Sequence, residues 1–268
     1  MRLQNLIAVL IFFSIINFQS CSTVPVTGRS QLNVIPSSEL MSMSFQQYDQ
    51  FLKENKLSTN RKQSAMIKRV GDKISKAVEQ YFAQNNMSDE LKGYQWEFNL
   101  VENDQVNAWA MPGGKVVFYT GILPITKTEA GVAVVMGHEV AHAVAEHGGE
   151  RMSHQVVQQF GGMALSKLLE EESDALQGIL LTAYGVGSQV GVMLPFSRLH
   201  ESEADHLGLI FMAMAGYNPQ EAVNFWQRMA DAKGGEAPPE WLSTHPSDQT
   251  RIDDLKKAIP EAMKYYKK

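Results

Sequence analysis

Apolar side chains recur with a helical period in two stretches near the start of the chain. They return every three or four positions over residues 60–84, and a similar pattern covers residues 37–57. This spacing places one apolar stripe along each predicted helix. The stripe of the second helix consists of Met66, Val70, Ile74, Ala77, Val78 and Tyr81. We expect both helices to act as packing elements.

The apolar period then changes from helical to alternating. Residues 94–101 alternate between apolar and polar positions, which is typical of a half-buried strand. Residues 107–115 predict a second strand with a turn, and residues 116–119 predict a third strand that leads into a helix. The expected fold class is therefore α+β, mostly helical, with a small β-sheet beside that helix.

Residues 126–149 are apolar nearly all round, which predicts one buried helix. Thr126 and Glu129 stand in capping-box spacing at its start, and the Gly148-Gly149 pair ends the pattern. Further helices are expected over residues 150–174, from Ser197 onward, and over residues 218–232 and 247–259. Between them, residues 175–195 carry no charge.

The uncharged segment 175–195 has the length of a membrane span, but four glycines and several polar residues weaken that interpretation. We expect a buried helix or hairpin that covers the functional site. A loop that touches the membrane is the alternative.

The first 20 residues predict a signal peptide, because residues 6–16 form an apolar run too short to span a bilayer. Cys21, the single cysteine, follows directly, as in a bacterial lipoprotein signal. We expect lipidation of Cys21 and a membrane anchor of acyl chains. An ordinary cleaved signal with a chance cysteine is the alternative. Residues 21–36 predict an extended tether, and residues 37–268 one domain.

Composition narrows the function further. The content of 44% hydrophobic and 20% charged residues is that of a globular protein. A net charge of −5 leaves no basic footprint, so nucleic acid is not an expected partner. With one cysteine, the domain has no internal disulfide and no cysteine-ligated metal site.

The buried helix contains the pattern His138-Glu139-Val140-Ala141-His142. Residues at i and i+4 share a helix face, so both imidazoles can reach one Zn²⁺ ion. Glu139 lies one step round the helix, where it can take a proton from an activated water molecule. An exposed helix with two solvated histidines is the alternative, and the apolar surroundings argue against it.

A third metal ligand must come from elsewhere, because a catalytic zinc commonly has three protein ligands. The metzincin extension fails, since Ala145 and Gly148 occupy its positions. Glu201 and Asp205 are spaced i and i+4 on a later helix, so we predict Glu201 as the ligand and Asp205 as the residue that orients a ligand histidine. Glu203 falls on the far side as a solvated charge.

The remaining histidines receive weaker predictions. His200 and His206 are expected to be surface or packing residues, and His147, nine positions after His138, to be hydrogen-bonded structure rather than a ligand. His245 precedes a proline on a loop, where it can cap or pack, stabilise an oxyanion, or occupy the fourth zinc position as a latch. Arg251 is expected to pair with a carboxylate.

The strand that precedes the metal helix suggests how a peptide binds. A free sheet edge can pair with an extended substrate backbone. Asn107 and the turn with Gly113 and Gly114 are candidates for this substrate side. A simple β-hairpin is the alternative.

These motifs together resemble peptidase family M48, which contains the CAAX prenyl endopeptidases and the HtpX-like proteases. Stretches similar to its bacterial lipoprotein branch are Pro25–Arg29, Asn107–Gly114, and Ser243–Pro246 followed by Arg251. The resemblance implies a zincin-like peptidase of the gluzincin type with Glu201 as third ligand and Asp205 beside the site. It also implies work in envelope protein quality control. Several clear transmembrane helices are missing, so prenylated substrates are not implied.

The sequence therefore predicts a membrane-anchored zinc endopeptidase that acts on unfolded or misassembled envelope proteins. The expected location is the envelope of a diderm bacterium, facing the periplasm, with the anchor in the outer membrane. Two alternatives stay open: a chaperone for outer-membrane proteins with a latent zinc site, and a zinc hydrolase of a non-peptide bond.

Overall fold

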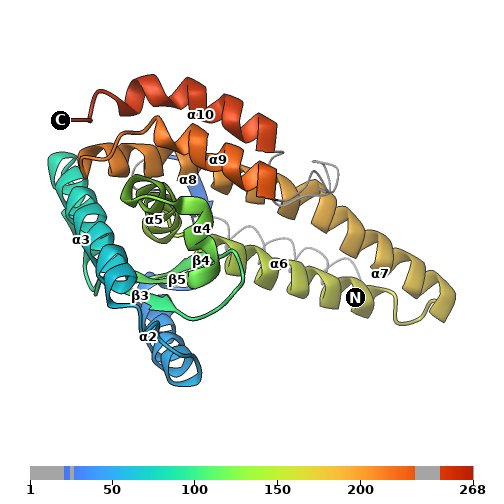
Figure 1. The fold of residues 1–268 in the computed structure, drawn as a ribbon. Coiled ribbons are helices and arrows are strands. Elements are labelled where there is room, and N and C mark those ends of the chain that lie inside the picture. The colour runs from blue at the N-terminus through green and yellow to red at the C-terminus, as the bar shows by residue number, and fades with distance from the viewer. Residues whose placement is uncertain (1–20, 25–26, 233–247, 268) are drawn as a thin grey trace.

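The computed structural model describes residues 21–24, 27–232 and 248–267 (Figure 1). Its centre is helix α5, Glu129–Val144, which the other elements surround (Figure 1). The small sheet lies against one side of this helix, and long helices cover the others. The predicted class, α+β and mostly helical with a small sheet beside the metal-motif helix, is confirmed.

Helix α5 is shorter than the predicted 126–149 segment. Its N-cap is Thr128, whose side chain accepts a hydrogen bond from the Gly131 amide, whereas Thr126 ends a separate short helix, α4, Leu123–Thr126. At the other end, Glu146 adopts a left-handed conformation with a φ of 56°. The chain turns there, so Gly148 and Gly149 lie in the first turn of the next helix instead of ending this one.

Helices α3, α8 and α9 pack against α5, helix α2 contacts the sheet, and helix α10 packs on α8 and α9. Their bounds are α2 Ser37–Glu54, α3 Arg61–Gln84, α8 Leu194–Met214, α9 Glu221–Ala232 and α10 Asp248–Ala262. Helix α3 begins where the Asn60 side chain accepts from the Gln63 amide, and it buries the predicted apolar stripe from Val70 to Val78 against α5 and the sheet. Helix α8 begins one turn before the predicted Ser197 cap, because Pro195 fits its first turn.

Helices α5 and α8 cross at two glycines. A Cβ atom added to Gly208 would lie 2.8 Å from the His138 nitrogen, and one added to Gly137 would lie 2.7 Å from the Gly208 carbonyl oxygen. The two backbones therefore touch, which only glycine allows. This crossing brings the His138 turn of α5 beside the Glu201 turn of α8.

The sheet has the strand order β3-β5-β4, with β3 Glu97–Val101, β4 Ala108–Met111 and β5 Lys115–Tyr119. Strand β5 pairs parallel with β3 and antiparallel with β4. Gly113 and Gly114 form the β4–β5 turn with φ values of 83° and 88°. Their carbonyls accept hydrogen bonds from Gln95 and Glu97, so both glycines serve the turn.

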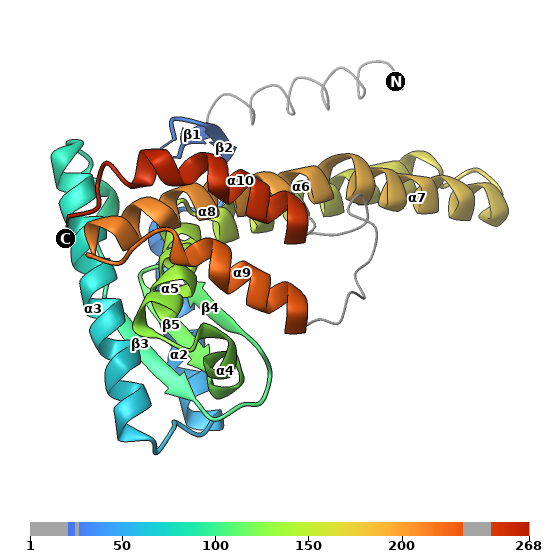
Figure 2. The ribbon, with the colours of Figure 1, turned by 45° about the horizontal axis from the view of Figure 1, so that its top comes forward.

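The N-terminal segment is not the extended tether that was predicted. Strands β1, Cys21–Thr23, and β2, Ser30–Leu32, form a hairpin that packs on α6, and Val24 is completely buried (Figure 2). The Val34 amide donates to the Ser153 hydroxyl of α6 at 3.0 Å. Polar contacts of this segment, described below, explain the docking. The predicted signal peptide lies outside the described residues.

Helices α6, His147–Leu168, and α7, Asp174–Ser188, extend away from the body as a pair (Figures 1 and 2). The prediction that residues 175–195 form a buried cover over the site is wrong, because no residue of α7 is buried and this helix packs along α6. A π-helical segment, Gln189–Met193, joins α7 to α8. Among the described residues, no helix has the length and apolarity needed to span a membrane.

Candidate active site

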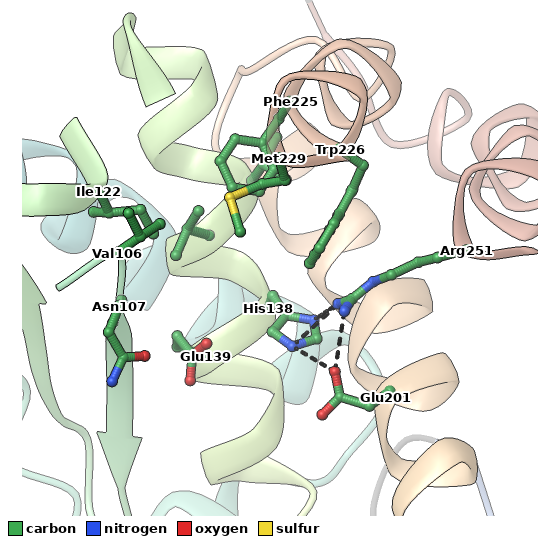
Figure 3. A pocket seen from close by; sticks show the side chains of 13 residues that line it. Val106, Asn107, Ile122, His138, Glu139, Glu201, Phe225, Trp226, Met229 and Arg251 are labelled. Atoms are coloured by element: carbon green, nitrogen blue, oxygen red, sulfur yellow. Dashed lines mark hydrogen bonds and ion pairs between the residues drawn. The ribbon is translucent and has the colours of Figure 1, made fainter. Parts of the chain in front are cut away.

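Three side chains from α5 and α8, His138, His142 and Glu201, converge on one point, and Figure 3 shows His138 and Glu201. The Nε2 atoms of His138 and His142 lie 3.0 Å apart, and they are 3.4 and 3.3 Å from the two carboxylate oxygens of Glu201. Ligand atoms about 2.0–2.1 Å from a tetrahedral zinc ion lie about 3.3–3.4 Å from one another. The spacing of the three donor atoms is therefore close to that required around such a metal ion.

The other ring nitrogens are occupied, so each imidazole has one orientation. His138 Nδ1 lies 2.9 Å from an Asp205 oxygen, and His142 Nδ1 lies 2.8 Å from Nδ1 of His147. Partners of this kind fix the tautomer of a ligand histidine and direct its second nitrogen at the metal. The structure thus places Asp205 where the sequence predicted an orienting carboxylate.

The two histidines of the donor set have pKa values shifted in opposite directions. Burial and the Arg251 guanidinium favour neutral His138, but hydrogen bonds to the Asp205 and Glu201 carboxylates outweigh them and raise its pKa to about 10. Burial and the charge on His138 lower the pKa of His142 to about 3.

Glu139 lies beside the donor set rather than within it. Its carboxylate lines the same pocket as Asn107 and His138 (Figure 3). Burial, opposed by the charge on His138, raises the pKa of Glu139 to about 7. A carboxylate with a pKa near the working pH is suited to accept a proton and return it.

Arg251 closes the site from α10, as a residue paired with carboxylates. Its Nε and one terminal nitrogen each donate to an Asp205 oxygen at 2.7 Å, and the other terminal nitrogen donates to Glu201 at 3.2 Å. The guanidinium lies over the Trp226 ring, 3.5 Å from its centroid. Arg251 thereby holds α10 and α9 against the face of α8 that carries both acids.

A pocket of about 260 Å³ opens beside these groups. One wall is polar, with His138, Glu139 and Glu201, and the remainder is mainly apolar. The apolar lining comes from α5, α9, the β4 region and the turn before α4: Val106, Ala108, Ile122, Val134, Val135, Phe225, Trp226 and Met229. A chain that enters the pocket meets apolar side chains and a proton acceptor together.

Comparison with known proteins identifies the group to which this site belongs. The model of peptidase family M48 matches residues 68–259, a range that contains His138, His142 and Glu201. The chain belongs to peptidase family M48. It is therefore a metallopeptidase, and the HExxH pattern at His138–His142 is that of its family.

Named relatives of this M48 peptidase support endopeptidase activity. The mitochondrial metalloendopeptidase OMA1 of Saccharomyces cerevisiae is 29% identical over 261 residues, 94% of this chain and 73% of its own. The Schizosaccharomyces pombe protein of the same name is 38% identical, over 70% of this chain and 53% of its own. The beta-barrel assembly-enhancing protease of Escherichia coli is 32% identical, over 60% of this chain and 34% of its own. The chain thus spans about half or less of the last two relatives.

The substrate-side predictions divide. Asn107 lines the pocket, at the start of β4, but Gly113 and Gly114 lie at the far end of that strand and do not line it. His245 lies outside the described residues.

Sequence reasoning missed the buried hydrogen bonds that lie behind the metal-binding residues of this M48 site. Glu203, predicted to be a solvated charge, is 7% exposed and hydrogen-bonds to His147. His147 is hydrogen-bonded, as predicted, and the turn at Glu146 brings it back beside His142. His200 is buried and lies 2.8 Å from Glu150.

Proposed function

We propose that this M48 peptidase is a zinc endopeptidase that cleaves unfolded or misassembled proteins of the cell envelope. The observation that carries the peptidase chemistry is the convergence of His138, His142 and Glu201 on one point, with Glu139 beside it and a pocket in front. Nitrogen and carboxylate donors in this number suit Zn²⁺.

Each residue has a role in peptide hydrolysis. His138, His142 and Glu201 would hold the zinc ion, which would supply Lewis-acid activation of water and of the scissile carbonyl. Glu139 takes the proton of the attacking water and then delivers it to the leaving amine. Asp205 accepts a hydrogen bond from Nδ1 of His138, which favours the tautomer whose Nε2 has no hydrogen and can bind the metal ion.

Removing the metal tests this proposal directly. Incubation of the purified protein with a zinc chelator will abolish casein cleavage, and addition of stoichiometric Zn²⁺ will restore it. Cleavage is followed by release of labelled peptides, and zinc is measured on the same samples. Cleavage that continues in metal-free protein would contradict the mechanism. Zinc binding and partner capture without cleavage would support a chaperone instead.

The sheet edge offers the substrate backbone a place to pair. Among the described residues, β4 pairs only with β5. The Tyr119 amide donates to the Asn107 carbonyl, which starts the antiparallel ladder. Alternation along the ladder then directs the amide and carbonyl groups of Ala108 and Ala110 away from β5. An extended peptide that pairs there passes Glu139 and the donor set.

The apolar lining predicts a preference at the cleavage site. We expect a bulky apolar substrate residue next to the scissile bond, because Phe225 and Met229 offer only apolar contacts there. Replacing Met229 with glutamate will lower kcat/KM for a leucine-containing peptide by about 10-fold, and less for the alanine analogue, in line with the cost of burying a charge beside an apolar group. Cleavage of a peptide library that contains the leucine and alanine peptides measures kcat/KM for each of them.

Met163→Glu is the matched control for this prediction, since Met163 is 57% exposed on α6, outside the pocket. It should leave both peptides unaffected. Equal losses for the leucine and alanine peptides in Met229→Glu would show that the pocket does not select the substrate residue.

The envelope location and the anchor complete the proposal. Relatives with the names mitochondrial metalloendopeptidase and beta-barrel assembly-enhancing protease support work on proteins at membranes. Cys21, at the start of β1, supports a lipid anchor at the docked N-terminal hairpin. In a diderm bacterium, wild-type protein will incorporate labelled palmitate and sediment with membranes, and Cys21→Ser will do neither. Wild-type protein that incorporates no palmitate and does not sediment with membranes would exclude the lipid anchor but leave the proposed peptidase activity unaffected.

A further inference from the structure

A buried chain of hydrogen bonds begins on the side of His142 that faces away from the donor set. His142 Nδ1 contacts His147 Nδ1 at 2.8 Å, and His147 Nε2 contacts a Glu203 oxygen at 2.9 Å. His147 has no exposed surface, and Glu203 is nearly as buried. Neither group lines the pocket, so neither acts on substrate.

Donor and acceptor counting assigns every proton in this chain. If His142 Nε2 coordinates the metal ion, the ring hydrogen is on Nδ1, which donates a hydrogen bond to His147 Nδ1. His147 then holds its own hydrogen on Nε2, which donates to the acceptor-only carboxylate of Glu203. The ligand His138 donates to a carboxylate directly, whereas His142 reaches one through a second histidine.

The far end of the chain is held by the N-terminal segment. Arg29 donates to both oxygens of Glu150 on α6, at 2.9 and 2.7 Å, and its Nε donates to Glu203 on α8 at 3.1 Å. The Thr27 hydroxyl also hydrogen-bonds to Glu203. Two buried carboxylates from different helices need a shared cation, and the planar fork of arginine contacts both at once.

We propose that His147, Glu203 and Arg29 form a positioning chain for the metal ligand His142, so that docking of residues 27–32 on α6 and α8 is required for tight metal binding. The inference rests on the proposed zinc site. It makes the segment next to Cys21 part of the metal site's support, although this segment lies far from the metal motif in sequence.

A purely structural role for the cluster makes a different prediction. In that case its loss lowers the stability of the whole domain but leaves the geometry of the bound metal unchanged. A positioning role alters the metal site itself, because a ligand histidine that loses its partner can rotate or change tautomer. The zinc dissociation constant and the visible spectrum of the Co²⁺ form separate the two.

The experiment compares three variants of the full chain. His147→Phe keeps a ring at the buried position but removes both nitrogens, and we expect zinc to bind about 10–100-fold more weakly with an altered Co²⁺ spectrum. Arg29→Met should weaken zinc binding in the same direction by a smaller factor. Arg29→Lys keeps the charge and should lie between Arg29→Met and wild type. Zinc affinity is measured by competition with a chromophoric chelator.

Two controls have no part in the chain. Arg69→Met breaks another arginine–glutamate pair, with Glu129, on the surface of the domain. Val78→Ala removes buried volume from α3 and lowers stability away from the site. Both should keep the wild-type zinc dissociation constant and Co²⁺ spectrum. If Arg29→Met does not fold, Thr27→Val removes a single contact to Glu203 and replaces it in the series.

The outcomes distinguish this inference from the function on which it rests. Wild-type zinc affinity and spectrum in His147→Phe and Arg29→Met, with stability reduced as in Val78→Ala, would reduce the chain to a structural role. Wild-type protein that binds no zinc would overturn the proposed function instead. Weaker zinc binding in both variants, with unchanged controls, supports the positioning chain.

Discussion

Replacing Glu139 with glutamine will lower kcat/KM for casein-derived peptides by about 10²–10⁴-fold, the usual contribution of a general acid–base group. Glutamine keeps the size of the side chain but cannot accept a proton from water. Because Glu139 is not one of the three converging donors, the variant will hold as much zinc as the wild type. Peptide cleavage and metal content, measured on the same preparation, check both halves of the prediction.

Glu129→Gln is the matched control for this substitution. Glu129 lies on the same helix, in its first turn, and pairs with Arg69 and Tyr217 outside the pocket. Its replacement affects a surface ion pair, which contributes little to stability. A Glu139→Gln protein that retains activity within about 10-fold of wild type would assign the proton transfer to another group.

Local spacing was sufficient to predict the parts of the site that lie on one helix. His138 and His142 share a face because their separation is one helical turn, and the same rule paired Glu201 with Asp205. The strands were also predictable, since alternation survives in β3 with Phe98 and Leu100 buried. These predictions needed no knowledge of what packs against each element.

Predictions that depend on distant partners failed. Glu203 was assigned to solvent by helical geometry, yet its face of α8 is covered by Arg29, which is 174 positions away in the sequence. The end of α5 was placed at two glycines, but the left-handed residue is Glu146, whose carboxylate accepts a hydrogen bond from Asn33. Helical periodicity gives the faces of a helix but not their neighbours.

The uncharged segment 175–195 shows the same limit from the opposite direction. Its apolar residues suggested burial, but the pair α6–α7 leaves several of them in contact with solvent, among them Ile179 at 66% exposure and Val186 at 59%. Low charge indicates that a helix can be buried. It does not supply the partner that would bury it.

Replacing Gly208 with alanine will weaken zinc binding and destabilise the domain, although the change adds one methyl group far from the substrate. The new Cβ would lie 2.8 Å from the backbone nitrogen of His138, whereas ordinary van der Waals contacts begin at 3.4 Å. Relief requires α5 and α8 to separate by about 0.6 Å, whereas metal–ligand distances tolerate about 0.2 Å. We expect a loss of about 1–3 kcal/mol in the free energy of unfolding.

Gly178→Ala is the control for this prediction, because the same substitution is expected to change the free energy of unfolding in the opposite direction. Gly178 lies in α7 with no atom within 4 Å of an added Cβ, so alanine should stabilise that helix by up to about 1 kcal/mol. Denaturant unfolding and chelator competition on both variants then compare the same chemical change at two helix positions. Because Gly208 touches the backbone of His138, stability and zinc affinity should fall together in Gly208→Ala alone. Unchanged zinc affinity there would show that the α5–α8 crossing can open without moving the ligands.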